Sequence, residues 1–157
     1  MRTLHSVASV IDILRLNQQT LAVAESLTGG GLGAAITAVP GASDVFLGGV
    51  IAYSAQTKES ILKVEREQIS KHGVVSEEVA IAMANGVREL LGSTWGISTT
   101  GVAGPGNSDG VPAGTVWIAI SGPVNQSTQL EVEGEREVVR NASISSAISA
   151  FARILRP

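Results

Sequence analysis

Residues 20–33, with the sequence TLAVAESLTGGGLG, decide the fold class. Residues 20–24 form a short apolar run rich in β-formers, which predicts a buried strand. The run ends at Glu25 and Ser26, glycines follow at 29, 30, 31 and 33, and residues 32–39 place apolar side chains on one helical face. The stretch therefore predicts a strand, a tight turn and a helix, which together form a repeating unit of α/β folds.

The same alternation continues outward in both directions. Residues 4–17 have the spacing of an amphipathic helix, and an apolar run predicts a second buried strand at 48–53. Further strands are expected at 95–99, 115–120 and 127–132. Further helices are expected at 56–62, 65–71, 77–91, which Ser76 would cap and Gly92 would end, and 135–155. In the last helix we expect these residues to face inward: Val138, Val139, Ala142, Ile148, Phe151 and Leu155. The pattern predicts a single three-layer α/β/α domain over residues 1–157, with a mostly parallel or mixed sheet.

The composition restricts the chemistry that this domain can perform. The 157 residues include no cysteine and two histidines, and the aromatic residues are Trp 2, Tyr 1 and Phe 2. A thiol nucleophile, a disulfide framework and a Cys-ligated metal site are therefore excluded, and with two histidines we do not expect a His-rich metal site. A net charge of −3 and the shortage of rings argue against a nucleic-acid or anionic-membrane partner.

The N-terminal segment indicates the location of the protein. Asp12 and Arg15 interrupt its apolar pattern, and no run approaches the length of a membrane span. We therefore expect a cytoplasmic protein without a signal peptide. A mean hydropathy of +0.27 indicates apolar surface and leads us to expect a homo-oligomer.

Three unusual segments follow predicted strands, at residues 25–30, 53–58 and 100–106. Ligands of open α/β sheets bind beyond the carboxyl ends of the strands, so we expect these segments to meet. The sequence around Ser26 is typical either of a helix N-cap or of a nucleophile on a sharp turn, where glycines let backbone N–H groups approach a ligand. Lys58 is either a surface lysine or a buried base. In the second case, burial lowers its pKa enough for the neutral amine to activate the serine.

The remaining candidates each have two interpretations. Tyr53 is either a half-buried strand aromatic or a hydroxyl that orients Lys58 or relays a proton. The loop at 100–106 matches neither a dinucleotide nor a Walker pattern, and it is either a surface connection or a functional loop. Arg136 and Arg140 form either a solvated helix face or an anion site. Glu25 is either a helix-terminal acid or a residue that supports the site.

Taken together, these motifs resemble the CinA C-terminal domain family, the nicotinamide-nucleotide amidohydrolases. The family pattern A-E-S-x-T-G-G, G-G-x-x-x-Y-S-x-x-x-K, H-G-x-V-S, T-G-x-A-G-P, P-x-G-T-V and G-x-R-x-x-V-R occurs here in order, at residues 24–30, 48–58, 72–76, 100–105, 112–116 and 134–140. The family often has a cysteine after the serine, whereas Leu27 stands here. It also includes longer proteins, and we expect residues 1–157 to form the amidohydrolase domain alone.

The resemblance implies a Ser/Lys hydrolase that converts nicotinamide mononucleotide to nicotinate mononucleotide and ammonia. It also implies that the domain uses no metal and no organic cofactor. The family's serine and lysine correspond to Ser26 and Lys58, with Tyr53 as a further catalytic candidate. The residues expected at the substrate are Glu25, Thr28, Gly29, Gly30, Thr100, Gly101, Ala103, Gly104, Arg136 and Arg140. Backbone N–H groups of the 28–30 turn or of the 101–106 loop would hold the oxyanion. The alternatives are a non-catalytic nucleotide- or phosphate-binding module linked to competence or DNA damage, and a purely structural domain.

Overall fold

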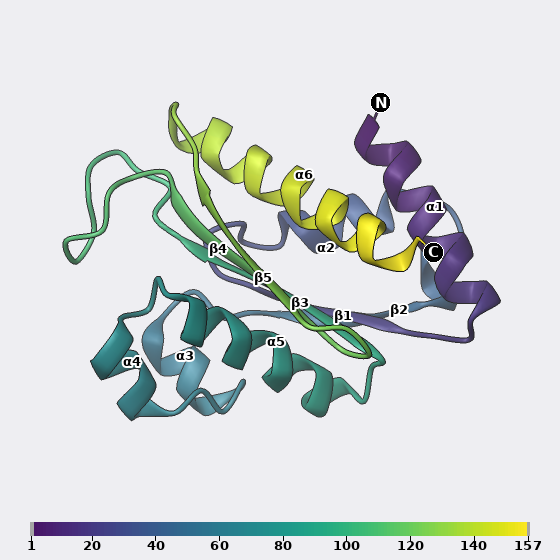
Figure 1. The fold of residues 1–157 in the computed structure, drawn as a ribbon, viewed down its shortest axis with the longest axis horizontal. Coiled ribbons are helices and arrows are strands. Elements are labelled where there is room, and N and C mark those ends of the chain that lie inside the picture. The colour runs from purple at the N-terminus through teal and green to yellow at the C-terminus, as the bar shows by residue number, and fades with distance from the viewer. Residues whose placement is uncertain (1, 157) are drawn as a thin grey trace.

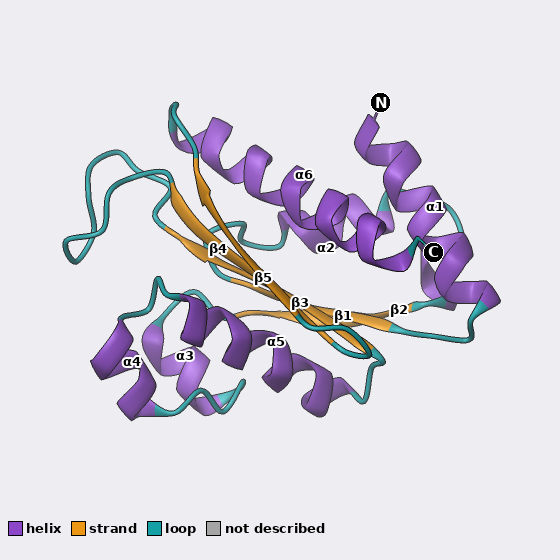
Figure 2. Cartoon of the chain, in the orientation of Figure 1, coloured by secondary structure: helices purple, strands orange, loops and turns teal. Residues whose placement is uncertain are grey.

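A five-stranded sheet crosses the molecule and helices cover both of its faces (Figures 1 and 2). The computed structural model describes residues 2–156. Helices α1, α2 and α6 lie on one face, and α3, α4 and α5 lie on the other (Figure 1). The elements are α1 (Arg2–Leu16), β1 (Leu21–Glu25), α2 (Gly31–Thr37), η1 (Ala42–Asp44), β2 (Phe46–Ile51), α3 (Ala55–Ser60), α4 (Arg66–His72), α5 (Glu77–Leu91), β3 (Trp95–Gly101), β4 (Thr115–Ser121), β5 (Gln126–Glu131) and α6 (Arg136–Leu155). The predicted three-layer α/β/α architecture is confirmed.

The strand order β2-β1-β3-β4-β5 makes the sheet mixed. β1 pairs in parallel with β2 and β3, whereas β4 is antiparallel to both β3 and β5. Only β4 therefore runs against the common direction. Because Glu25 pairs with Ile51 on one side and with Thr99 on the other, the residues that follow β1, β2 and β3 meet at one edge of the sheet.

The core lies on both faces of the sheet, and β1, which lies between β2 and β3, is buried along its whole length. On the face covered by α6, Phe151 packs edge-on against Trp95 with ring centroids 5.3 Å apart. On the opposite face, Met83 of α5 packs with Leu62 and Val64. Such contacts hold the helices against the sheet, because each fully buried large apolar side chain contributes about 1.5–3 kcal/mol.

Two expectations about burial are wrong. We expect the strand at 48–53 to be buried, but every second residue of β2, which forms an edge of the sheet, is exposed, because successive side chains point to opposite faces and one of these faces is open there. Val138 was expected to face the core, but it is exposed, whereas its neighbour Val139 is fully buried. One residue corresponds to about 100° around a helix, so Val138 is turned away from the side on which Val139 meets the core.

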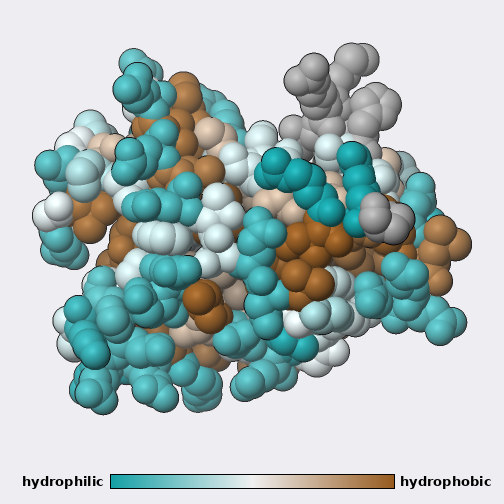
Figure 3. All heavy atoms as spheres, in the orientation of Figure 1, coloured by the Kyte–Doolittle hydropathy of each residue, from teal (hydrophilic) through white to brown (hydrophobic). Residues whose placement is uncertain are grey.

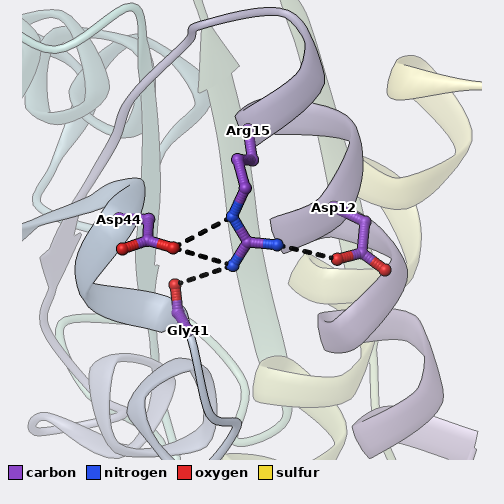
Figure 4. A network of polar contacts seen from close by, with 4 residues as sticks. All are labelled: Asp12, Arg15, Gly41 and Asp44. Carbon is purple, nitrogen blue, oxygen red and sulfur yellow. Dashed lines mark hydrogen bonds and ion pairs between the residues drawn. The ribbon is translucent and has the colours of Figure 1, made fainter.

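The helix termini follow the predicted signals. Ser76 caps α5, since its Oγ accepts a hydrogen bond from the Val79 amide at 3.3 Å, and Gly92 ends the helix with a left-handed φ of 66°. At the end of α1, Arg15 contacts Asp12, the Asp44 carboxylate and the Gly41 carbonyl (Figure 4). These side chains are half exposed, so the network joins α1 to η1 without contributing more than about 1 kcal/mol per pair.

Apolar residues also reach the surface. In the view of Figure 3 they occur as separate patches between hydrophilic residues. The most exposed large apolar side chain is Leu16 at the end of α1. The homo-oligomer expected from the hydropathy stays a prediction. No helix among residues 2–156 combines the length and apolar character that crossing a bilayer requires.

Candidate active site

Ser26 is the first residue after β1 and lies at the edge where the three parallel strands end. Its amide donates to the Thr99 carbonyl at 2.9 Å, which extends the pairing with β3 and fixes the serine against the sheet. The residue is 7% exposed. It is not a helix cap, because α2 begins five residues later and Gly30, with a φ of 102°, occupies the cap position. The N-cap interpretation of Ser26 is therefore wrong.

Lys58 reaches Ser26 from the neighbouring strand end. It lies on α3, a short helix that begins after Ser54 because the Ser54 Oγ accepts the Thr57 amide. The lysine is only 2% exposed. Its Nζ donates to the Ser26 Oγ at 2.9 Å, to the Ala52 carbonyl at 2.7 Å and to the Tyr53 carbonyl at 3.4 Å. The interpretation of Lys58 as a surface lysine is therefore wrong.

Burial lowers the pKa of Lys58 from 10.5 to about 8, because the ammonium has lost its hydration. Within residues 2–156, no carboxylate forms an ion pair with this ammonium that would oppose the shift. A neutral amine has two N–H donors and one lone pair. The Ala52 and Tyr53 carbonyls can accept both donors, which leaves the lone pair for the Ser26 hydroxyl. The site can therefore accept a proton from serine.

Backbone carbonyls of the turn after Ser26 accept hydrogen bonds that fix its conformation. The Ser26 carbonyl accepts the Gly29 amide at 3.1 Å and the Thr28 carbonyl accepts the Gly31 amide at 2.9 Å. Arg140 donates from Nε to the Leu27 carbonyl at 3.1 Å and from Nη2 to the Thr28 carbonyl at 3.3 Å. The Gly29 amide, expected as an oxyanion donor, is thus already engaged.

A cavity of about 430 Å³ opens beside Ser26 and Lys58. Its wall includes the exposed Tyr53 and the first residue of α6, Arg136. Arg136 donates from Nη1 to the Gly104 carbonyl at 2.6 Å and from Nη2 to the Tyr53 hydroxyl at 3.2 Å. Eight of the predicted site residues line this cavity: Ser26, Tyr53, Lys58, Thr100, Gly101, Ala103, Gly104 and Arg136.

Tyr53 is neither a half-buried strand residue nor in contact with Lys58 through its hydroxyl. It lies two residues beyond β2, and its side chain is 63% exposed rather than half-buried in a strand. Its hydroxyl accepts from Arg136, while only its backbone carbonyl contacts Lys58. The tyrosine therefore orients Lys58 through the main chain and not through its hydroxyl.

The other predicted site residues do not line the cavity. Both carboxylate oxygens of the buried Glu25 accept amides of α2, from Leu32 at 2.7 Å and from Gly33 at 3.0 Å, so this residue is a helix-terminal acid. The Thr28 hydroxyl is buried against that of Thr99 at 2.8 Å. These contacts leave neither side chain free for a substrate. The further predicted residues outside the cavity lining are Gly29, Gly30 and Arg140.

The cavity also has walls that the sequence did not indicate as site residues. Leu27 and Ala55 lie beside the serine and the lysine, and Val74 and Val75 belong to the H-G-x-V-S motif, which could have marked them. The loop between β3 and β4 extends past the end of the sheet (Figure 1) and adds a polar wall. Its tip is a two-residue hairpin turn, in which Ser108 and Val111 exchange backbone hydrogen bonds across Asp109 and Gly110. The lining residues of this loop that the sequence did not indicate are Asn107, Ser108 and Asp109, whereas Val102, Pro105 and Gly106 lie in the predicted 100–106 segment.

Comparison with known proteins assigns the family. The sequence matches the CinA C-terminal domain over residues 4–155. The chain belongs to the CinA C-terminal domain family. It is 49% identical to a CinA-like protein of Synechococcus sp. (strain RCC307) over 149 residues, covering 92% of this chain and 36% of that protein. A CinA-like protein of Parasynechococcus marenigrum is 48% identical, with 96% and 36% covered. The chain thus spans about a third of the length of these relatives.

Solved structures of the CinA family have the same fold. The competence damage-inducible protein A of Klebsiella pneumoniae superposes with a TM-score of 0.94 at 33% identity, covering 98% of this chain and 96% of that chain. A CinA superfamily protein of Escherichia coli gives 0.92 at 30% identity, covering 98% and 89%. Within the described part of the chain, no three His, Asp or Glu side chains are grouped so that they could hold a metal ion.

Proposed function

We propose that this domain is an amidohydrolase that deamidates nicotinamide mononucleotide to nicotinate mononucleotide and ammonia. One observation supports this most strongly: a buried lysine with a pKa lowered to about 8 lies 2.9 Å from a serine hydroxyl at the wall of a cavity. A serine hydroxyl is a weak nucleophile, and an adjacent base activates it. The nucleotide substrate follows from the family resemblance.

In the first half of the reaction, neutral Lys58 removes the Ser26 proton while Oγ forms a bond to the carboxamide carbon. The carbonyl oxygen becomes an oxyanion. When this intermediate collapses, the C–N bond breaks and protonated Lys58 gives its proton to the leaving group, which departs as ammonia. In the second half, Lys58 deprotonates a water that attacks the ester carbon, the bond to Oγ breaks, and the proton returns to Ser26.

Backbone amides next to the serine are the proposed oxyanion donors. Within residues 2–156, the amides of Leu27, Thr28, Ala103 and Gly104 donate to no protein acceptor. The amide that follows a nucleophilic serine commonly binds the oxyanion in α/β hydrolases. One such donor is worth about 3–4 kcal/mol of the barrier.

Substrate binding is proposed to use the cavity between the 100–106 loop and the start of α6. Its volume of about 430 Å³ falls in the ordinary range for small-molecule sites. Arg136 is the one arginine in its lining, and a guanidinium fork suits a phosphate group. The Tyr53 hydroxyl beside this arginine supplies a further polar contact at the mouth. The nucleotide would therefore lie with its carboxamide at Ser26 and its phosphate toward Arg136.

The test measures ammonia release from nicotinamide mononucleotide by the wild type and by two variants. Ser26→Ala and Lys58→Met each abolish release, whereas the matched controls Ser149→Ala and Lys71→Met, at exposed positions, leave it unchanged. Rates like those of the wild type in either site variant would refute the dyad. Nucleotide binding without ammonia release by the wild type would instead identify a non-catalytic binding module.

A further inference from the structure

Arg140 contacts the turn after Ser26 but does not line the cavity. We propose that Arg140 is a positioning residue, which holds the Leu27 and Thr28 peptide groups so that the N–H groups following the serine stay in place for the oxyanion. This inference rests on the proposed function. It gives Arg140 a role other than the solvated helix face and the anion site that the sequence left open.

The planarity of the peptide bond fixes the direction of the N–H groups that follow Ser26. In a trans peptide the C=O of one residue and the N–H of the next point in opposite directions. Because Arg140 holds the Leu27 carbonyl, the Thr28 N–H is directed away from α6. Because the Gly29 amide holds the Ser26 carbonyl, the direction of the Leu27 N–H is fixed in the same way. These are the two amides next to the serine that have no described acceptor.

The packing of α6 on the turn supports the same role. A Cβ at Gly31 would lie 2.6 Å from the Cδ1 of Ile144, one helical turn beyond Arg140, so the glycine permits α6 to approach closely. Within residues 2–156, Arg140 forms no ion pair, and its recorded acceptors are two carbonyls of the turn. The guanidinium therefore binds the main chain beside Ser26, and its positive charge stabilises an anion that develops there.

The two arginines of the first turns of α6 thus have different tasks. Arg136 lies at the cavity wall with its guanidinium on the Gly104 carbonyl and the Tyr53 hydroxyl. Arg140, four residues later, contacts only the main chain of the serine turn. A phosphate ligand contributes to substrate affinity, so its loss raises KM, whereas a positioning residue acts in the transition state, so its loss lowers kcat.

The experiment compares Arg140→Met with Arg136→Met, using nicotinamide mononucleotide and its nucleoside, which lacks the phosphate. Arg140→Met lowers kcat about 10- to 100-fold for both substrates and leaves KM for the nucleotide within about twofold, because misplaced oxyanion donors cost that much. Arg136→Met raises KM for the nucleotide more than for the nucleoside. Arg153→Met, an exposed position on the same helix, is the control with wild-type kinetics. A selective rise of KM for the nucleotide in Arg140→Met would overturn the inference.

A second readout does not depend on the substrate. A fluorophosphonate reacts with an activated serine and places its P=O oxygen where an oxyanion would bind, so its rate of reaction with Ser26 can be followed by intact mass. Arg140→Met slows this labelling about tenfold or more, and Arg140→Lys, which can reach one carbonyl at a time, gives an intermediate rate. Labelling of both variants at the wild-type rate refutes the positioning role alone. Failure of the wild type both to be labelled and to release ammonia refutes the proposed function and the inference with it.

Discussion

The most informative prediction concerns the pH dependence of kcat/KM, because it follows from the environment of one side chain. Lys58 acts as a base only when neutral, and burial lowers its pKa to about 8. The neutral fraction is then about 10% at pH 7 and about 90% at pH 9. The rate constant kcat/KM should therefore rise about tenfold across this interval, with a slope near one below pH 8 and a plateau above pH 9.

The assay is the initial rate of ammonia release at substrate concentrations far below KM. The phosphate of the substrate has its second pKa near 6, so it does not change charge over the interval. Circular dichroism at each pH verifies that the protein stays folded. A flat profile between pH 7 and pH 9, or one that falls, would refute the assignment of Lys58 as the base.

The remaining predictions concern stability and are measured by urea denaturation. Lys58 has a pKa of about 8 in the folded protein against 10.5 as the ordinary value, so the unfolded state binds more protons between these pH values and stability rises with pH across that window. Below pH 8, burial of the charged lysine lowers the free energy of unfolding by the full amount of about 3 kcal/mol. Lys58→Met should therefore be more stable than the wild type at pH 7 by up to that amount, and an equal or lower stability would contradict this. Glu25→Ala removes the acceptor for two buried amides of α2 and should cost about 3 kcal/mol, while Glu67→Ala, in an exposed first turn, should cost almost nothing; equal effects would show that the carboxylate is not needed. Gly86→Ala should destabilise by about 2 kcal/mol although alanine favours helices, because its Cβ would collide with the Leu62 carbonyl; a more stable variant would show that α5 can move away from this segment.

Local signals explain why the central part of the fold could be predicted from the sequence. The apolar run at residues 20–24 corresponds to β1, which is buried throughout, and Ser76 and Gly92 bound α5 as their side-chain and backbone preferences require. The meeting of Ser26 and Lys58 also follows from a general rule. Both lie beyond the carboxyl ends of adjacent parallel strands, although 32 positions separate them in the sequence.

The errors concern what only tertiary packing decides. The composition of β2 resembles that of a buried strand, but strand order places it at the edge of the sheet. Arg136 and Arg140 share one helix face in the sequence, yet Arg136 lines the cavity, whereas Arg140 donates to carbonyls of the turn after Ser26. For Tyr53 the sequence left open a strand aromatic and a hydroxyl that orients Lys58 or relays a proton, and the structure presents the Tyr53 carbonyl to Lys58.

The central claim is that Ser26 forms a covalent ester with the substrate after Lys58 has removed its proton. Hydroxylamine tests this most directly, since it competes with water for an ester intermediate and converts it to a hydroxamate. With the wild type, nicotinamide mononucleotide and hydroxylamine should yield the hydroxamate of the nucleotide in proportion to the hydroxylamine concentration, and Ser26→Ala should yield none. Formation of nicotinate mononucleotide alone, at an unchanged rate and without hydroxamate, would contradict the account.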